Sequence, residues 1–168
     1  MFAVAFFSEN KSRIAGTVHF SQESRDSLVT VTFRITGLVP NSVHACHIHK
    51  YGDLRDCGNC CDHYNPHGAK HGSRLLHGKN RHAGDLSNNL MTDAAGFCDF
   101  RYEDDLISLY GEHSIVGRSV VIHSGYDDHG VYRDEPSERG KLSGETGNAG
   151  SRLACAVIGL CSTEPGCF

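Results

Sequence analysis

Histidine is the residue type that suggests chemistry in this chain. It occurs 12 times in 168 residues and is concentrated between His44 and His82. In His47-Ile48-His49 the two imidazoles are two residues apart, so on a strand they project from one face, roughly 7 Å apart at Cα. Two such rings can bind one metal ion. By itself, however, a His-x-His pair fits two solvent-facing histidines equally well.

A second group of potential metal ligands follows. His71 comes eight residues after His63, His82 eleven residues after His71, and Asp85 three residues after His82. The segment that carries them is rich in Gly, Asn and Lys and has too few apolar residues to order itself, whereas a bound metal would order it. Three imidazoles and one carboxylate make the complete four-ligand set of a structural zinc site.

The His-x-His pair needs further partners. His123 ends the apolar run Ser119-Val120-Val121-Ile122, which predicts a strand returning to the core. A site of imidazole nitrogens in near-planar geometry favours Cu(II). Copper is therefore a candidate for the first group, although spacing alone leaves the metal open.

The elements that must position these residues are short strands. Alternating or β-branched stretches predict strands at Phe2–Phe7, Ile14–Phe20, Leu28–Ile35, Val43–His49, Gly96–Tyr102, Ile115–His123 and Leu153–Leu160. No segment has a long helical period. This pattern predicts an all-β antiparallel sandwich or closed barrel, interrupted by two long segments, Lys50–Leu90 and Ser124–Ser151, whose length is typical of functional loops.

Composition narrows the class of protein. The chain is 39% hydrophobic and 21% charged, as expected for one globular domain, residues 1–168, with a real core. A net charge of −4 gives no overall attraction for nucleic acid or anionic membrane. No apolar run reaches the roughly 18 residues of a transmembrane helix, and the N-terminus lacks the features of a secretory signal, so we expect a cytoplasmic protein.

Several motifs together resemble the copper/zinc superoxide dismutase family, over nearly the whole chain. They are His47-Ile48-His49-Lys50-Tyr51-Gly52-Asp53, His63-Tyr64-Asn65-Pro66, Lys70-His71-Gly72, Arg81-His82-Ala83-Gly84-Asp85-Leu86 and Gly147-Asn148-Ala149-Gly150-Ser151-Arg152-Leu153-Ala154-Cys155. The resemblance implies an eight-stranded antiparallel Greek-key barrel or sandwich, immunoglobulin-like, with two long functional loops.

The resemblance also implies the activity and its ligands. One copper and one zinc ion per chain would dismutate superoxide to oxygen and hydrogen peroxide through a copper redox cycle. Copper would be held by His47, His49, His63 and His123, and zinc by His63, His71, His82 and Asp85. His63 would bridge both metals and take up a proton when it detaches from reduced copper.

Further residues match family positions around the metals. Asp127, rather than its neighbour Asp128, would join a copper ligand to a zinc ligand, and His44 would be structural. Arg152 would attract and orient the small anion. Glu145 precedes Thr146 at a position where the family commonly has lysine. We therefore expect Arg152 and Thr146 to steer the substrate, with Lys141, Arg139 or Arg133 supplying the missing positive charge. If the steering is electrostatic, activity falls as ionic strength rises.

The resemblance implies a disulfide between Cys57 and Cys155. Cys60 and Cys61 could compete for the pairing with Cys57 or capture stray metal. No family role carries over to the remaining cysteines, and we expect most of them to be free thiols. The cysteines without a family role are Cys46, Cys60, Cys61, Cys98, Cys161 and Cys167.

The resemblance further implies a homodimer and a copper chaperone as a partner. Two other functions compete with an active dismutase. A metal buffer, or the dismutase-like domain of a copper chaperone, would more often have lost copper ligands or the arginine, yet His123 and Arg152 are both present. A zinc hydrolase needs an open zinc position, and the chain has no His-Glu-x-x-His pattern.

Overall fold

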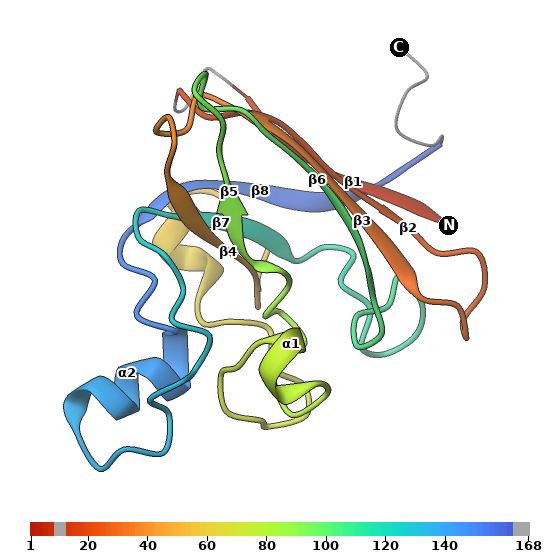
Figure 1. The fold of residues 1–168 in the computed structure, drawn as a ribbon. Helices are drawn as coiled ribbons and strands as arrows, with labels where there is room; N and C mark the ends of the chain where they lie inside the picture. Colours follow the sequence, from red (N-terminus) through yellow and green to blue (C-terminus); the bar gives the residue numbers. More distant parts are fainter. Residues whose placement is uncertain (9–12, 163–168) are drawn as a thin grey trace.

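The computed structural model describes residues 1–8 and 13–162, so Cys167 lies outside the described part. Eight strands run in the order β5-β4-β7-β8-β1-β2-β3-β6 and curve into a nearly closed barrel (Figure 1). The strands are β1 (Phe2–Phe7), β2 (Ala15–Ser21), β3 (Val29–Thr36), β4 (Val43–His49), β5 (Asn88–Met91), β6 (Cys98–Asp104), β7 (Ser119–His123) and β8 (Arg152–Cys161). All pairings are antiparallel, which confirms the predicted fold class.

The strand order is that of a Greek key. β1, β2 and β3 follow one another as hairpin neighbours, whereas the chain passes from one half of the barrel to the other between β3 and β4, between β5 and β6 and between β6 and β7. These crossovers place β4 beside β7, although the two strands are far apart in the sequence. Side chains from both halves meet in one core, which includes Val31, Phe33, Ile48 and Ile122.

The ends of β2, β3, β6 and β8 differ from the sequence-based prediction by one or two residues, and two differences are larger. Ile115–His123 was expected to be one strand, but β7 starts only at Ser119 because the preceding residues form a turn, in which the Arg118 N–H donates to the Ile115 carbonyl. β5 is an eighth strand, and most of it falls in the segment predicted to be a loop.

The two long segments lie at one side of the barrel and carry the only helices among residues 1–8 and 13–162 (Figure 1). The segment after β4 contains the 3₁₀-helix η1 (Cys57–Cys60) and α1 (Arg74–His77), and the segment after β7 contains α2 (Glu138–Thr146). Ser137 caps α2 by accepting from the Gly140 N–H. Among residues 1–8 and 13–162, no helix is both long and apolar enough to span a bilayer.

Candidate metal centre

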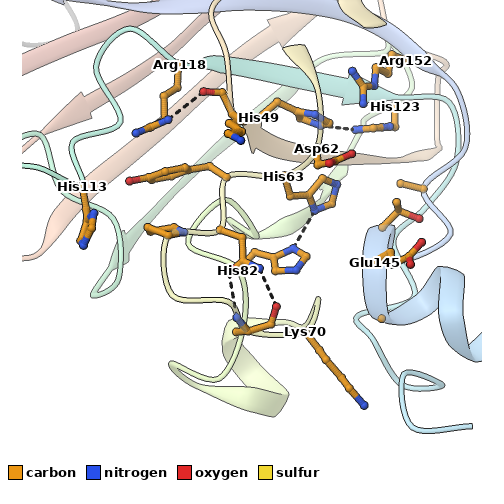
Figure 2. A pocket seen from close by; sticks show the side chains of 18 of the residues that line it. His49, Asp62, His63, Lys70, His82, His113, Arg118, His123, Glu145 and Arg152 are labelled. Carbon is orange, nitrogen blue, oxygen red and sulfur yellow. Dashed lines mark hydrogen bonds between the residues drawn. The ribbon is translucent and has the colours of Figure 1, made fainter. Parts of the chain in front are cut away.

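β4 and β7 position the first group of histidines. Side chains alternate between the faces of a strand, and Ile48 and Ile122 point into the barrel core. His47, His49 and His123 therefore project from the opposite face, which the two long segments cover, and all three are buried. Nε2 of His49 lies 3.3 Å from Nε2 of His123 (Figure 2).

His63 joins this group from the loop that follows β4. An isolated β-bridge pairs its backbone with that of His49, and its ring centroid lies 4.0 Å from that of His47. Its Nδ1 lies 2.9 Å from Oδ1 of Asp85. One ring therefore faces the β4–β7 histidines on one side and a carboxylate on the other.

The second group converges on the carboxylate of Asp85. Nδ1 of His71 and Nδ1 of His63 both lie 2.9 Å from Asp85 Oδ1, and Nδ1 of His82 lies 3.3 Å from it. His82 Nδ1 is also 3.4 Å from His63 Nδ1 (Figure 2). The structure thus brings together the four side chains that were predicted to bind zinc.

A buried arginine supports the turn that carries two of these side chains. The guanidinium of Arg81 is fully buried and donates to the carbonyls of His82 and Asp85. Its Nη2 lies 2.8 Å from a carboxylate oxygen of Asp104 at the end of β6. The turn is therefore anchored to the barrel by protein contacts alone.

Both groups fit metal ions. His47, His49, His63 and His123 offer nitrogen atoms within 4.8 Å of one another. Among them, Nδ1 of His47 and Nε2 of His63 are buried without a hydrogen-bond partner, which is costly unless a ligand satisfies them. Four imidazole nitrogens suit copper, and three imidazoles with one carboxylate suit zinc.

Asp127 connects the two groups. Its carboxylate lies 2.5 Å from Nε2 of His47 and 3.0 Å from Nε2 of His71. Asn88 donates to the same carboxylate at 3.0 Å. Gly147 packs against Asp127 and His71, and its backbone is in the left-handed region, at φ 64°. A Cβ at this position would lie 2.5 Å from both the Asp127 carboxylate and the His71 ring, so only glycine fits.

The neighbouring Asp128 has other partners. Its carboxylate accepts hydrogen bonds from the Gly130 N–H, the Ser143 hydroxyl and the Asn148 amide, all within the loop that follows β7. It therefore shapes this loop, whereas Asp127 contacts the two histidines.

The electrostatics of the two groups differ in the metal-free state. Burial lowers the pKa of His63 to about 3 and that of His123 to about 4. Burial also opposes the charge on His71, but the carboxylates of Asp85 and Asp127 outweigh it and raise the pKa to about 10. The histidines of the first group, which we call the copper-type group, are thus neutral at pH 7, as metal binding requires. His71 of the second, zinc-type group is instead positively charged.

His44 lies on β4 but faces away from the metal-binding groups. Its Nδ1 lies 3.0 Å from the main-chain carbonyl of His123. The ring is 2% exposed. It therefore contacts the backbone that carries His123 rather than the metal-binding atoms.

Arg152 is placed beside His123 by the pairing of β7 with β8. Its guanidinium donates to the carbonyls of Cys57, Gly58 and Cys61 at 2.6, 3.1 and 2.5 Å. A Cys57–Cys155 disulfide joins the same segment to β8, as predicted. The arginine is therefore fixed by a segment that is itself covalently tied down.

A pocket of about 900 Å³ opens onto the site (Figure 2). His49, His63, His123 and Arg152 line it, as does His82 of the second group, whereas Asp85 is fully buried and does not. Of the other residues predicted to guide a substrate, Thr146 lines the pocket. Lys141 does not, because it lies on an exposed face of α2.

Arg133 and Arg139 have structural partners. Arg133 donates to the carbonyls of His71 and Asn80, and Arg139 stacks on Tyr132. Sequence reasoning missed three cations that line the pocket: Lys50, Lys70 and Arg118. Lys50 and Lys70 stand directly beside predicted ligands, in His49-Lys50 and Lys70-His71, and that adjacency was the available signal.

An antiparallel Greek-key barrel whose outer face carries two adjoining ligand groups, sharing one histidine, defines a two-metal β-barrel protein. A family model described as copper/zinc superoxide dismutase matches residues 14–158. Cu-Zn superoxide dismutases of Neurospora crassa and Podospora anserina are each 43% identical to this chain over 150 residues, 89% of this chain and 92% of each relative. That of Candida albicans is 42% identical over the same shares. The chain belongs to the copper/zinc superoxide dismutase family.

Proposed function

We propose that this chain dismutates superoxide to molecular oxygen and hydrogen peroxide as an antioxidant defence. The observation that carries the proposal is His63, whose Nδ1 faces Asp85 while its buried Nε2 lacks a partner beside the β4–β7 histidines. Copper would be held by His47, His49, His63 and His123, and zinc by His63, His71, His82 and Asp85. The chain would form a single domain that holds one copper ion and one zinc ion.

When bound, copper supplies one-electron oxidation and reduction of superoxide, and zinc supplies a fixed positive charge next to it. Arg152 attracts the anion and orients it, because its planar guanidinium is always charged and three carbonyls hold it in place. His63 holds or releases a proton at Nε2 for the peroxide product, while Asp85 fixes the ring at Nδ1. Asp127 contacts the rings of both His47 and His71 and so fixes their positions relative to each other.

The charge of the pocket supports electrostatic steering on a chain of net charge −4. We assign most of the electrostatic attraction for superoxide to Arg152. Thr146 contributes at the rim of the pocket, and Lys141 acts at longer range. The pocket cations Lys50, Lys70 and Arg118 contribute to the same field, against the acidic Asp62, Glu112 and Glu145.

The test compares wild type with His123→Ala, with His19→Gln on β2 as a control remote from the site. Metal content per chain and the rate of superoxide loss are measured for each. We expect one copper and one zinc in wild type, and loss of copper and activity but not of zinc in His123→Ala. A wild-type protein that binds only zinc and leaves superoxide untouched would show a non-enzymatic metal-binding protein instead.

A homodimer, copper delivery by a chaperone and a cytoplasmic location belong to the same proposal. Apolar side chains of Leu153 and Val157 on β8 and Phe6 on β1 are 39%, 41% and 66% exposed, which suits a surface that pairs with a second copy. Light scattering of wild type and Val157→Glu tests the dimer. Copper loading in cells with and without a chaperone, together with cell fractionation, tests the other two.

A further inference from the structure

Cys57 belongs to a Cys-x-x-Cys sequence, Cys57-Gly58-Asn59-Cys60, which forms the whole of η1. In a 3₁₀-helix, residues three apart lie above one another on the same side, and a rise of about 2.0 Å per residue separates them by about 6 Å along the axis. Disulfides form between Cα atoms about 4.4–6.8 Å apart. Cys57 and Cys60 can therefore bond to each other without unfolding η1.

The thiol of Cys60 is available for this reaction. Cys57 is bonded to Cys155, with a Cα–Cα distance of 5.7 Å, whereas Cys60 is a free cysteine. Cys60 is fully buried, and its Sγ lies 3.7 Å from the carbonyl oxygen of Asp53. Burial shields this thiol from solutes but does not block attack on a neighbour in the same helix.

We propose that Cys60 is an internal nucleophile for the Cys57–Cys155 disulfide, which makes η1 a thiol–disulfide exchange site. The Cys60 thiol gives up the proton that Cys155 later takes up, and its thiolate attacks Sγ of Cys57. The Cys57–Cys60 bond forms as the Cys57–Cys155 bond breaks, and Cys155 leaves as a thiolate that takes up a proton. One disulfide and one thiol are present before and after, so no oxidant or reductant is consumed.

The adjacent Cys61 does not share this position. It lies just beyond the end of η1 with φ 64°, and its Sγ lies 3.8 Å from the carboxylate of Asp62. Its carbonyl accepts from Arg152 and lies 2.7 Å from Nδ1 of His49. Cys61 is therefore a matched control, since it is a thiol in the same segment but outside the helical spacing.

Exchange has a structural consequence that does not depend on the metals. The disulfide is the covalent tie between η1 and β8, and the carbonyls of Cys57 and Gly58 hold Arg152. When Cys57 bonds to Cys60 instead, η1 keeps its own bridge but loses its tie to β8. The exchange thus changes what fixes the arginine, and no metal-binding side chain takes part in it.

Irreversible trapping of Cys155 tests the proposal. The metal-loaded protein is incubated with iodoacetamide at pH 8 without any reductant, quenched in acid and digested with trypsin. Cleavage after Arg55, Lys70 and Arg152 separates a peptide that holds Cys57, Cys60 and Cys61 from one that holds Cys155. The exchanged form is recognised as alkylated Cys155 together with a disulfide inside the first peptide.

We expect this product to accumulate in wild type and in Cys61→Ser with first-order kinetics that are independent of protein concentration. In Cys60→Ser we expect alkylation of Cys155 to be at least about tenfold slower. The product in Cys61→Ser identifies the Cys57–Cys60 bond even if Cys60→Ser does not fold. Equal rates in Cys60→Ser and wild type, or no product in wild type and Cys61→Ser, would overturn the proposal.

Discussion

The guanidinium of Arg152 donates to the carbonyl of Cys57 at 2.6 Å across 95 positions of sequence. The disulfide from Cys57 to Cys155 joins the same two segments. The segment that carries Cys57 and the start of β8 are therefore held together by a non-covalent and a covalent contact. Several measurements can test how far this arrangement and the metal-binding groups determine the properties of the protein.

Replacement of Arg152 tests electrostatic steering. Arg152→Gln removes a fixed positive charge beside His123, so we expect kcat/KM for superoxide to fall about tenfold or more at low salt and its decline with rising ionic strength to flatten. Stopped-flow decay of superoxide over a range of salt concentrations measures both effects. Arg34→Gln, an exposed change on β3, is the control. A salt-independent rate in wild type would refute steering.

Replacement of Asp127 tests the link between the two ligand groups. Asp127→Asn removes the carboxylate that lies against both His47 and His71, and changes to such supporting partners typically cost about 10- to 100-fold in metal affinity. Chelator competition for zinc and copper measures the loss. Asp134→Asn, whose carboxylate is exposed, should change neither affinity. Unchanged affinity for both metals in Asp127→Asn would contradict this role.

Removal of the disulfide should destabilise the fold. Its ends are 98 residues apart, for which the chain-entropy model gives about 4.7 kcal/mol as the largest expected loss in the free energy of unfolding. Denaturant unfolding of metal-free Cys155→Ser against wild type measures it, with Cys61→Ser as the control. A difference below about 1 kcal/mol would mean that other contacts already hold the two segments together.

Zinc binding should release a proton from His71. The pKa of His71 is raised to about 10 in the metal-free protein, so the ring is charged at pH 7 and must lose its proton to bind a metal. Stability from this charge is fully present below the unfolded pKa of about 6.5 and is lost as pH rises towards 10.

Calorimetry in buffers of different ionisation enthalpy counts the protons released. Copper binding to the zinc-loaded protein should release no proton from His123, since burial lowers its pKa to about 4 and the ring is already neutral. It should release one proton from His63, because a ring that binds two metals must give up the proton on its second nitrogen. An NMR titration of metal-free protein in which His71 loses its proton near pH 6.5 would contradict the prediction.

The free thiols should differ widely in reactivity. Burial raises the pKa of the Cys98 thiol to about 11 and that of Cys46 even further, so little thiolate forms at pH 8. Cys61 and Cys161 are partly exposed and should react with iodoacetamide before these two. Mass mapping over time measures the order. Equally fast labelling of Cys46 and Cys61 in the folded protein would disprove it.

Much of the fold was predictable because most strands bury one face. β3 reads Val-Thr-Val-Thr-Phe-Arg-Ile-Thr, and its apolar residues alternate inward without exception. β5 was missed because Asn88-Asn89-Leu90-Met91 is only four residues long and has no β-branched residue. Its pairing with β4 depends on distant contacts, which periodicity does not report.

The ligand groups were predictable from residue type and spacing, but their supports were not. Asn88 and Gly147 contact Asp127 only because the loops fold over β4 and β7. Lys141 was expected near the substrate because of its charge, yet it does not line the pocket. It lies on α2, and the position around the helix decides which way its side chain points. Such positions become visible only once the three-dimensional path of the loops is known.

Arg81 links the zinc-type group to an edge strand of the barrel. Its buried guanidinium ties the turn of His82 and Asp85 to Asp104, the last residue of β6, and β6 is an edge strand that lies at the opposite end of the sheet order from β5. A natural or engineered substitution at Asp104 would thus leave a buried cation beside ligand backbone with the weaker partner Asp105, 3.9 Å away and exposed, as its counter-charge. Variants at this position should be classed with metal-ligand variants, even though Asp104 itself offers no ligand.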